Sequence, residues 1–181
     1  MKLKILLSIS LTLLVVNVLL SQSVSVPKTY NKPVLMHYMP WFETPEFNQK
    51  WGSHWTMNNQ NPDIIVDAAT GKRQIASHFY PLIGPYSSID PAVIEYHLLL
   101  MKYAGVDGVL IDWYGVQGSN GDINSLLTNS NALIDKTDAI GLDFAIILED
   151  RFSRSIVDVQ QNMSYMKNNY FNKSNYFRYG A

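Results

Sequence analysis

The chain of 181 residues contains no cysteine. This absence excludes a disulfide framework, a cysteine nucleophile, a thiolate metal site and a lipid anchor attached to cysteine. A protein without disulfides depends on its core for stability. Hydrophobic residues make up 47% of the sequence, which is enough to build such a core.

Charge and nucleotide-binding motifs are also scarce. Charged residues make up 16% of the chain, its net charge is −1, and no run rich in Lys and Arg occurs, so we expect no nucleic-acid partner. No G-x-G-x-x-G follows the first predicted strand and no G-x-x-x-x-G-K-[ST] is present, which argues against dinucleotide and P-loop folds. The histidines show no H-x-H or H-x-x-x-H spacing, so no metal site is predicted; they are His37, His54, His78 and His97.

The N-terminus has the pattern of a secretory signal. Lys2 and Lys4 precede an apolar run over residues 5–20, and small and polar residues follow. The run is near the short end of the about 17–25 residues that span a bilayer, and polar residues interrupt it. We predict that residues 1–25 are cleaved, that the protein is secreted or periplasmic, and that no stable membrane insertion remains. A retained anchor is the alternative.

Apolar runs alternate with helical patterns along the rest of the chain. A polar loop and a small hairpin-like excursion separate the first two strands, over residues 43–61 and 61–73. The segment 170–181 reads as the approach to a further strand. The spacing predicts strands over 33–41, 75–80, 106–113 and 144–148, and helices over 91–104, 123–140 and 156–168.

This alternation predicts an α/β fold. The near-continuous apolar run of residues 106–113 is typical of a strand that is buried on both faces of a parallel sheet. Repeated βαβ units with right-handed crossovers favour a (β/α)8 TIM barrel. A full barrel needs about 250 residues, so we expect residues 26–181 to form only the N-terminal half of a truncated catalytic domain, with about four strands and three helices.

The predicted strands end in acidic and aromatic residues. The last two strands lead into Asp112, Trp113, Tyr114, Glu149 and Asp150. Because barrel enzymes carry their chemistry at the carboxyl ends of the strands, we predict a sugar site there. Asp112 would bind hydroxyl groups and Trp113 would stack on a sugar ring. The alternatives are an acid that caps the following turn and a Trp that packs beneath a loop.

Aromatic residues also gather around the end of the first strand. Tyr38 and Trp41 end that strand, and Trp51, His54 and Trp55 follow in the polar loop. Flat sugar faces stack on such rings, although tryptophan more often fills a core. We predict that Tyr38, Trp41, His54 and Trp55 line the cleft, and core packing is the alternative.

Several longer phrases resemble one enzyme family. HYMPWF at 37–42, SHW at 53–55, the stretch 77–115 with YPLIGPYSSIDPAVIE, and FAIILEDR at 144–151 are similar to glycoside hydrolase family 99 and its relatives. That family contains endo-α-mannosidases and endo-α-mannanases. The resemblance covers about residues 33–151, in order and without large gaps.

The resemblance implies a (β/α)8 barrel and retaining cleavage within α-mannosides, without a metal or organic cofactor. One carboxylate deprotonates the sugar 2-hydroxyl, which attacks the anomeric carbon, and a second carboxylate protonates the leaving oxygen. In the family this pair lies on a later strand-end motif, which residues 1–181 do not contain. Glu149 matches a strand-end Glu of the family's active site. We therefore name Glu149 and Asp112 as catalytic candidates; an ion pair of Glu149 with Arg151 is the alternative.

Two other functions remain open. The chain could be a secreted carbohydrate-binding protein without catalysis. It could also act on another polysaccharide, because Asp150 and Arg151 follow Glu149 where the family's mannosidases have Pro-Tyr. In each case an oligosaccharide or polysaccharide is the expected partner. Two glycosylation sequons, at 162–164 and 172–174, matter only in a eukaryotic host.

Overall fold

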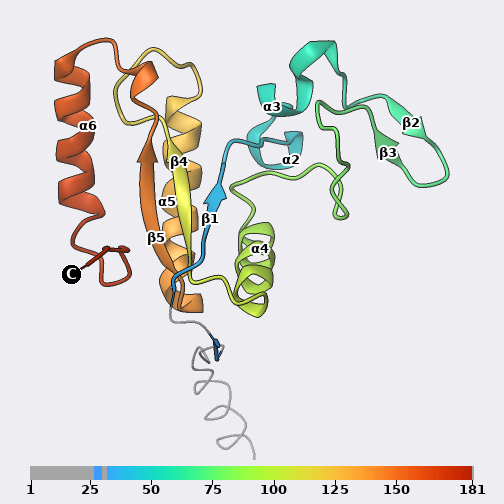
Figure 1. Cartoon of the computed structure of the whole chain (residues 1–181). Helices are drawn as coiled ribbons and strands as arrows, with labels where there is room; N and C mark the ends of the chain where they lie inside the picture. The colour runs from blue at the N-terminus through green and yellow to red at the C-terminus, as the bar shows by residue number, and fades with distance from the viewer. Residues whose placement is uncertain (1–26, 30–31, 181) are drawn as a thin grey trace, which may run out of the picture.

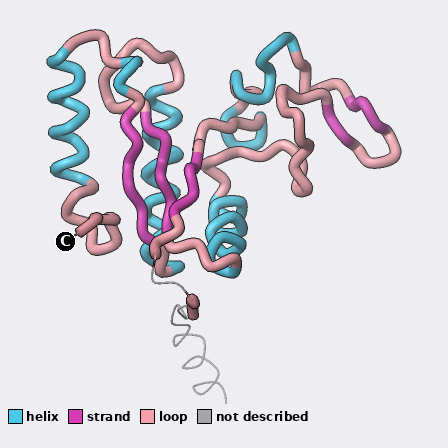
Figure 2. Tube along the Cα trace, in the orientation of Figure 1, coloured by secondary structure: helices cyan, strands magenta, loops and turns pink. Residues whose placement is uncertain are grey.

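The computed structural model describes residues 27–29 and 32–180, so the predicted secretory signal lies outside its described part. The centre of the fold is a three-stranded parallel sheet with the order β1-β4-β5 (Figures 1 and 2). The strands are β1 Leu35–Tyr38, β4 Gly108–Trp113 and β5 Asp143–Leu148. These bounds confirm three of the four predicted strands and the parallel pairing.

Helices connect the strands and cover one face of the sheet. They are α4 Pro91–Tyr103, α5 Ile123–Ile140 and α6 Ile156–Asn169, each within a residue or so of its predicted range. α4 begins as expected, because the Asp90 carboxylate accepts a hydrogen bond of 2.9 Å from the Ala92 amide. α5 ends at Gly141, whose φ of 71° suits glycine. No helix among the described residues is long and apolar enough to cross a bilayer.

The two faces of the sheet differ. Side chains alternate along each strand, so residues two apart share a face. The face under the helices is the core, where Val109, Ile111, Trp113 and Phe144 are fully buried. The strand registers place six other side chains on the opposite face: His37, Leu110, Asp112, Ala145, Ile147 and Glu149. All of these residues except Asp112 are at least partly exposed.

A small lobe joins β1 to α4. Figure 1 shows it on the β1 side of the sheet, away from α6. The predicted hairpin excursion is confirmed as an antiparallel pair of β2 with β3. The elements of the lobe are α2 Pro45–Asn48, α3 Ser53–Thr56, the 3₁₀ helix η1 Met57–Asn59, β2 Ile65–Asp67 and β3 Lys72–Arg73.

The predicted strand over 75–80 is wrong. The segment is irregular because its polar groups bond to the lobe rather than to a neighbouring strand. The Ala76 amide donates to the carbonyl of Trp55 at 2.9 Å. The Tyr80 hydroxyl accepts a hydrogen bond of 3.1 Å from the Arg73 amide. A short segment that begins with Ile75 and ends before Pro81 did not reveal these partners.

The chain returns to the sheet after α6. Tyr176 forms a parallel bridge with Phe144 of β5. The Phe144 amide donates to Asn175 at 2.9 Å, and the Phe177 amide donates to Phe144 at 2.8 Å. The predicted approach to a further strand therefore lies beside β5, opposite to β4.

Asn162 of α6 fixes the loop after β4. Its side-chain oxygen accepts hydrogen bonds from the amides of Val116 and Gln117, at 2.7 and 3.0 Å, and its nitrogen donates to Gln117 at 3.1 Å. Gly115 has a φ of 97°, and a Cβ there would lie 2.4 Å from the Asn162 side chain. Asn162 is fully buried and fully bonded, so the first sequon is inaccessible in the folded chain.

We expect Asn162→Ala to lower the free energy of unfolding by about 1–3 kcal/mol, because it removes a fully buried side chain that accepts from the amides of Val116 and Gln117. Urea denaturation measures the change. Asn168→Ala is the matched control, since Asn168 is an exposed residue of the same helix and should change stability by less than about 0.5 kcal/mol. Equal effects of the two substitutions would show that the loop does not depend on Asn162.

Candidate functional site

Two carboxylates share the face of the sheet that the helices leave open. Asp112 pairs in register with Ile147, and Glu149 lies two residues beyond Ile147, so both acids are on the same face. The Glu149 amide donates to the Trp113 carbonyl at 2.9 Å, which carries the parallel pairing to the strand ends. The structure thus brings the two catalytic candidates together at the carboxyl edge of the sheet.

Asp112 is the more buried of the two acids. Only 4% of the residue is exposed, and its Oδ1 has no hydrogen-bond partner among the described residues. Desolvation by burial raises the pKa of Asp112, the charge of Glu149 raises it further, and His37 opposes the shift. A buried acceptor without a donor is costly, so Asp112 is an acceptor available to a ligand.

His37 was missed as a site residue. It is exposed and lies one residue before Tyr38, on the face that carries Asp112. The pattern of alternation along β1 could have identified it, because Tyr38 points to the core.

Tyr114 lies near the two acids, whose charges act on its phenol. It is 6% exposed, and its ring centroid is 4.5 Å from that of Phe152 and 6.5 Å from that of Trp41. Burial raises the pKa of Tyr114 to about 12, and the charges of Asp112, Asp122 and Glu149 contribute. The phenol therefore stays protonated at neutral pH and keeps a proton to donate.

The lobe supplies a stacked pair of rings. The rings of Trp41 and His54 are nearly parallel and stacked, with centroids 4.3 Å apart and an interplanar angle of 4°. His54 Nε2 lies 4.0 Å from Asp122 Oδ2, which also accepts from the Ser53 hydroxyl at 3.1 Å. Burial lowers the pKa of His54, and the Asp122 charge opposes the shift. Asp122 thus ties the lobe to the start of α5, a role that its sequence position alone did not reveal.

Two predicted sugar platforms lie in the core instead. Trp113 is fully buried and packs against Tyr165 and Tyr170, with centroids 5.9 and 5.8 Å away. Trp55 is 1% exposed, and its Nε1 donates to the Tyr86 carbonyl at 3.0 Å. A ring without an exposed face cannot stack on a sugar, so the prediction for both residues is corrected to core packing.

Tyr38 also belongs to the core side of the sheet. Its hydroxyl lies 2.9 Å from His97 Nδ1 of α4, and burial raises its pKa. This correction follows from register, because Tyr38 pairs with the buried Ile111. Asp150 is exposed at the start of the 3₁₀ helix η2, Asp150–Phe152, just beyond the strand edge. Its position is the rim of the carboxyl edge of the sheet.

The donor set does not form a metal centre. Among residues 27–29 and 32–180, no three His, Asp or Glu side chains lie close enough together to hold an ion. What the site offers is two carboxylate acceptors, a phenol donor and a partly exposed indole. Such a set can bind hydroxyl groups and an apolar ring face.

The chain is similar to proteins of one known family. The model of glycosyl hydrolase family 99 matches residues 29–181. The chain is 30% identical over 151 residues to the glycoprotein endo-alpha-1,2-mannosidase of Rattus norvegicus, covering 78% of this chain and 32% of the rat protein. It is 26% identical over 158 residues to the protein of that name from Xenopus laevis, covering 82% and 34%.

A solved structure has the same fold. The GH99 endo-alpha-mannosidase of Bacteroides thetaiotaomicron aligns with a TM-score of 0.62 and 24% identity, covering 84% of this chain and 40% of that one. The chain spans about a third of the length of the curated relatives it matches. The family model covers most of the chain, and the resemblance seen in its motifs is confirmed: this protein belongs to glycosyl hydrolase family 99.

Proposed function

We propose that the chain binds an α-linked glycan, with α-mannosides as its substrate class, and forms part of an endo-acting glycosidase. The observation that carries the proposal is the buried Oδ1 of Asp112, which has no hydrogen-bond partner within 27–29 and 32–180. It lies on the open face of the sheet, as Glu149 does. The family's endo-α-mannosidases support the choice of sugar. Retention of configuration through the substrate 2-hydroxyl is the mechanism we propose for the whole enzyme.

Each residue of the site has a distinct task in this proposal. Asp112 and Glu149 accept hydrogen bonds from sugar hydroxyls, and their negative charge favours the positive charge that develops at the anomeric carbon. Tyr114 donates its phenolic proton to a ring or hydroxyl oxygen. Trp41, held by His54, offers its ring to the apolar face of a sugar.

The proton transfers need two further carboxylates. General acid catalysis requires a carboxyl group beside the leaving oxygen, and Asp112 and Glu149 are assigned to binding. We propose that residues 26–181 supply the N-terminal half of a (β/α)8 barrel whose later strands hold that pair. We also propose an extracytoplasmic location, secreted or periplasmic, without a cofactor.

A non-catalytic role is the second candidate. The described site has acceptors and a stacking ring without an assigned acid/base pair, which suffices to hold a glycan without cleaving it. The two roles differ in one measurement, because only the enzyme releases new reducing ends from α-mannan. A glycan array that includes other α-linked polysaccharides tests the choice of sugar, which the exposed Asp150 at the rim could alter.

We expect the chain to bind α-mannan oligosaccharides, and Trp41→Ala to raise the Kd about tenfold, since an aromatic platform contributes about 0.5–1.5 kcal/mol beyond buried area. Glu149→Gln should have a similar effect, because it removes a charged acceptor. Isothermal titration calorimetry measures both changes.

The matched control is Trp51→Ala, in the same lobe. Trp51 Nε1 bonds to Asp63 at 2.8 Å, and no aromatic contact joins Trp51 to the Trp41–His54 pair. Its substitution should leave the Kd within about twofold. Equal losses for Trp41→Ala and Trp51→Ala would place the glycan elsewhere and refute the proposed site.

A further inference from the structure

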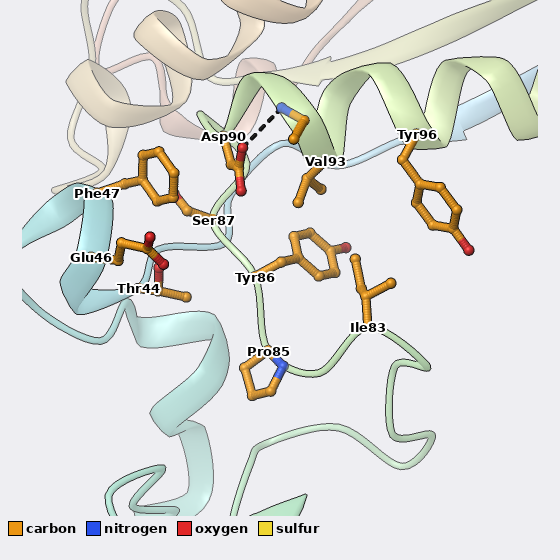
Figure 3. A pocket seen from close by; sticks show the side chains of 11 residues that line it. Thr44, Glu46, Phe47, Ile83, Pro85, Tyr86, Ser87, Asp90, Val93 and Tyr96 are labelled. Atoms are coloured by element: carbon orange, nitrogen blue, oxygen red, sulfur yellow. Dashed lines mark hydrogen bonds between the residues drawn. The ribbon is translucent and has the colours of Figure 1, made fainter.

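A second cavity lies beside the start of α4. Its volume is about 320 Å³, and α2, the turn before α4 and the first turns of α4 surround it (Figure 3). An aromatic cluster separates it from the candidate site. Phe42 packs on Trp55 and on Tyr86, with centroids 4.2 and 5.2 Å away, and Tyr86 lines the cavity. On its other side, Phe42 contacts His54, the partner of Trp41.

Three aromatic side chains line this cavity: Phe47, Tyr86 and Tyr96. Phe47 is 42% exposed and Tyr96 is 41% exposed. Figure 3 shows Phe47 at one end, Tyr96 at the other and Tyr86 between them. Such rings offer apolar faces to a ligand from both sides.

Three polar side chains that line the cavity have unused hydrogen-bonding capacity among the described residues. Thr44 is 93% buried, lines the cavity and does not cap α2, and its hydroxyl takes part in no hydrogen bond within 27–29 and 32–180. Glu46 has no ion pair in the same part of the chain. Asp90 uses Oδ1 to cap α4, at 2.9 Å from the Ala92 amide, and its second oxygen has no hydrogen bond to the described residues.

We propose that this cavity is a second carbohydrate-binding site, which holds one hexose unit of a glycan without cleaving it. Sugar hydroxyls donate to the carboxylates of Glu46 and Asp90 and exchange hydrogen bonds with Thr44, while a ring face lies on Phe47 or Tyr96. The volume is near the lower end of the about 300–1,000 Å³ of small-ligand pockets, which fits a single ring. The choice of α-mannan as the first probe rests on the proposed function.

The experiment separates the two sites. The background is the full chain with Trp41→Ala and Glu149→Gln, which weakens the strand-end site. We titrate α-mannan oligosaccharides into this background and expect residual binding. Adding Glu46→Gln or Tyr96→Ala should raise the residual Kd about five- to tenfold, because each removes a charged acceptor or a ring.

Tyr103→Ala is the matched control, since Tyr103 is an exposed tyrosine of α4 that does not line the cavity. It should leave the residual Kd unchanged. Thermal unfolding confirms that each variant is folded. Thr44→Val, which keeps the shape of the side chain and removes the hydroxyl, should also weaken binding.

Three outcomes would overturn the second site. If the background binds nothing while the unmodified chain binds α-mannan, the strand-end site alone holds sugar and the proposed function stands. If Glu46→Gln and Tyr96→Ala leave the residual Kd unchanged, the glycan binds elsewhere. If lysine ethyl ester binds in a Glu46-dependent way and neither α-mannan nor α-glucan oligosaccharides do, the cavity is an amine site.

Discussion

Replacing Asp112 with Asn is expected to raise the Kd for α-mannan oligosaccharides about a hundredfold. The carboxylate is nearly enclosed, and its Oδ1 has no donor in the part of the chain that the structure describes, so a sugar hydroxyl would supply the missing partner. Hydrogen bonds to charged groups contribute about 1.5–3 kcal/mol, which corresponds to about ten- to 150-fold in affinity. Titration calorimetry at pH 7 measures the change.

The same substitution is expected to stabilise the chain. Burial and the charge of Glu149 raise the pKa of Asp112 above its ordinary value of 3.8, so the folded state favours the protonated form. Protonated Asp112 contributes fully to the free energy of unfolding at pH values below its pKa in the unfolded chain. This contribution is lost as the pH rises through its pKa in the folded chain. At pH 7 the charged Asp112 therefore opposes folding, and Asn removes that cost.

Thermal unfolding at several pH values checks this sign. Asp112→Asn should raise the Tm by about 2–4 °C at pH 7, which corresponds to about 1 kcal/mol. The gain in Tm should become smaller as the pH falls toward 3.8 and below. A lower Tm at pH 7 would show that Asp112 has a structural partner and is not reserved for a ligand.

Asp143→Asn provides the matched control at the opposite edge of the sheet. Asp143 begins β5, and burial together with the charge of Asp107 raises its pKa too. Its substitution should stabilise the chain in the same direction and leave the Kd unchanged. If both substitutions weaken binding equally, the effect comes from net charge and not from the site.

Much of the fold could be predicted from local patterns. Asp90-Pro91 and Gly141 mark helix ends through capping chemistry that depends only on neighbouring residues. The apolar run of β4 marks a central strand, because it leaves no polar position before Asp112. The segment 75–80 could not be predicted, because it bonds to other parts of the lobe: Ala76 to Trp55, about twenty residues upstream, and the Tyr80 hydroxyl to the Arg73 amide.

The site was predicted only in part. Asp112 and Glu149 end neighbouring strands, and the parallel register brings them to one face. Asp112 and Trp113 were assigned to the same cleft, although consecutive residues of a strand point to opposite faces. That alternation, applied to each strand, assigns Tyr38 and Trp113 to the core face and His37 to the open face of the sheet. The contact between His54 and Asp122 depends on how the lobe folds back, which no local pattern contains.

The largest effect on stability is expected for Trp113→Ala, about 3–5 kcal/mol of lost unfolding free energy. The ring is fully buried and packs against Tyr165 and Tyr170, so its removal leaves a cavity between β4 and α6. Urea denaturation measures the loss. Tyr103→Ala, which removes an exposed aromatic side chain from α4, should cost less than about 0.5 kcal/mol.

Trp113→Phe separates packing from sugar binding. Phe keeps an aromatic ring in the core and removes an indole N–H that has no partner among the described residues, so we expect a cost of only about 1–2 kcal/mol. The chain stays folded, and the Kd for α-mannan should equal that of the unmodified protein. A tenfold higher Kd for Trp113→Phe with unchanged stability would show that Trp113 contacts the sugar. An unchanged Kd with reduced stability establishes that the residue next to Asp112 serves the core, and that the two faces of β4 divide stability from recognition.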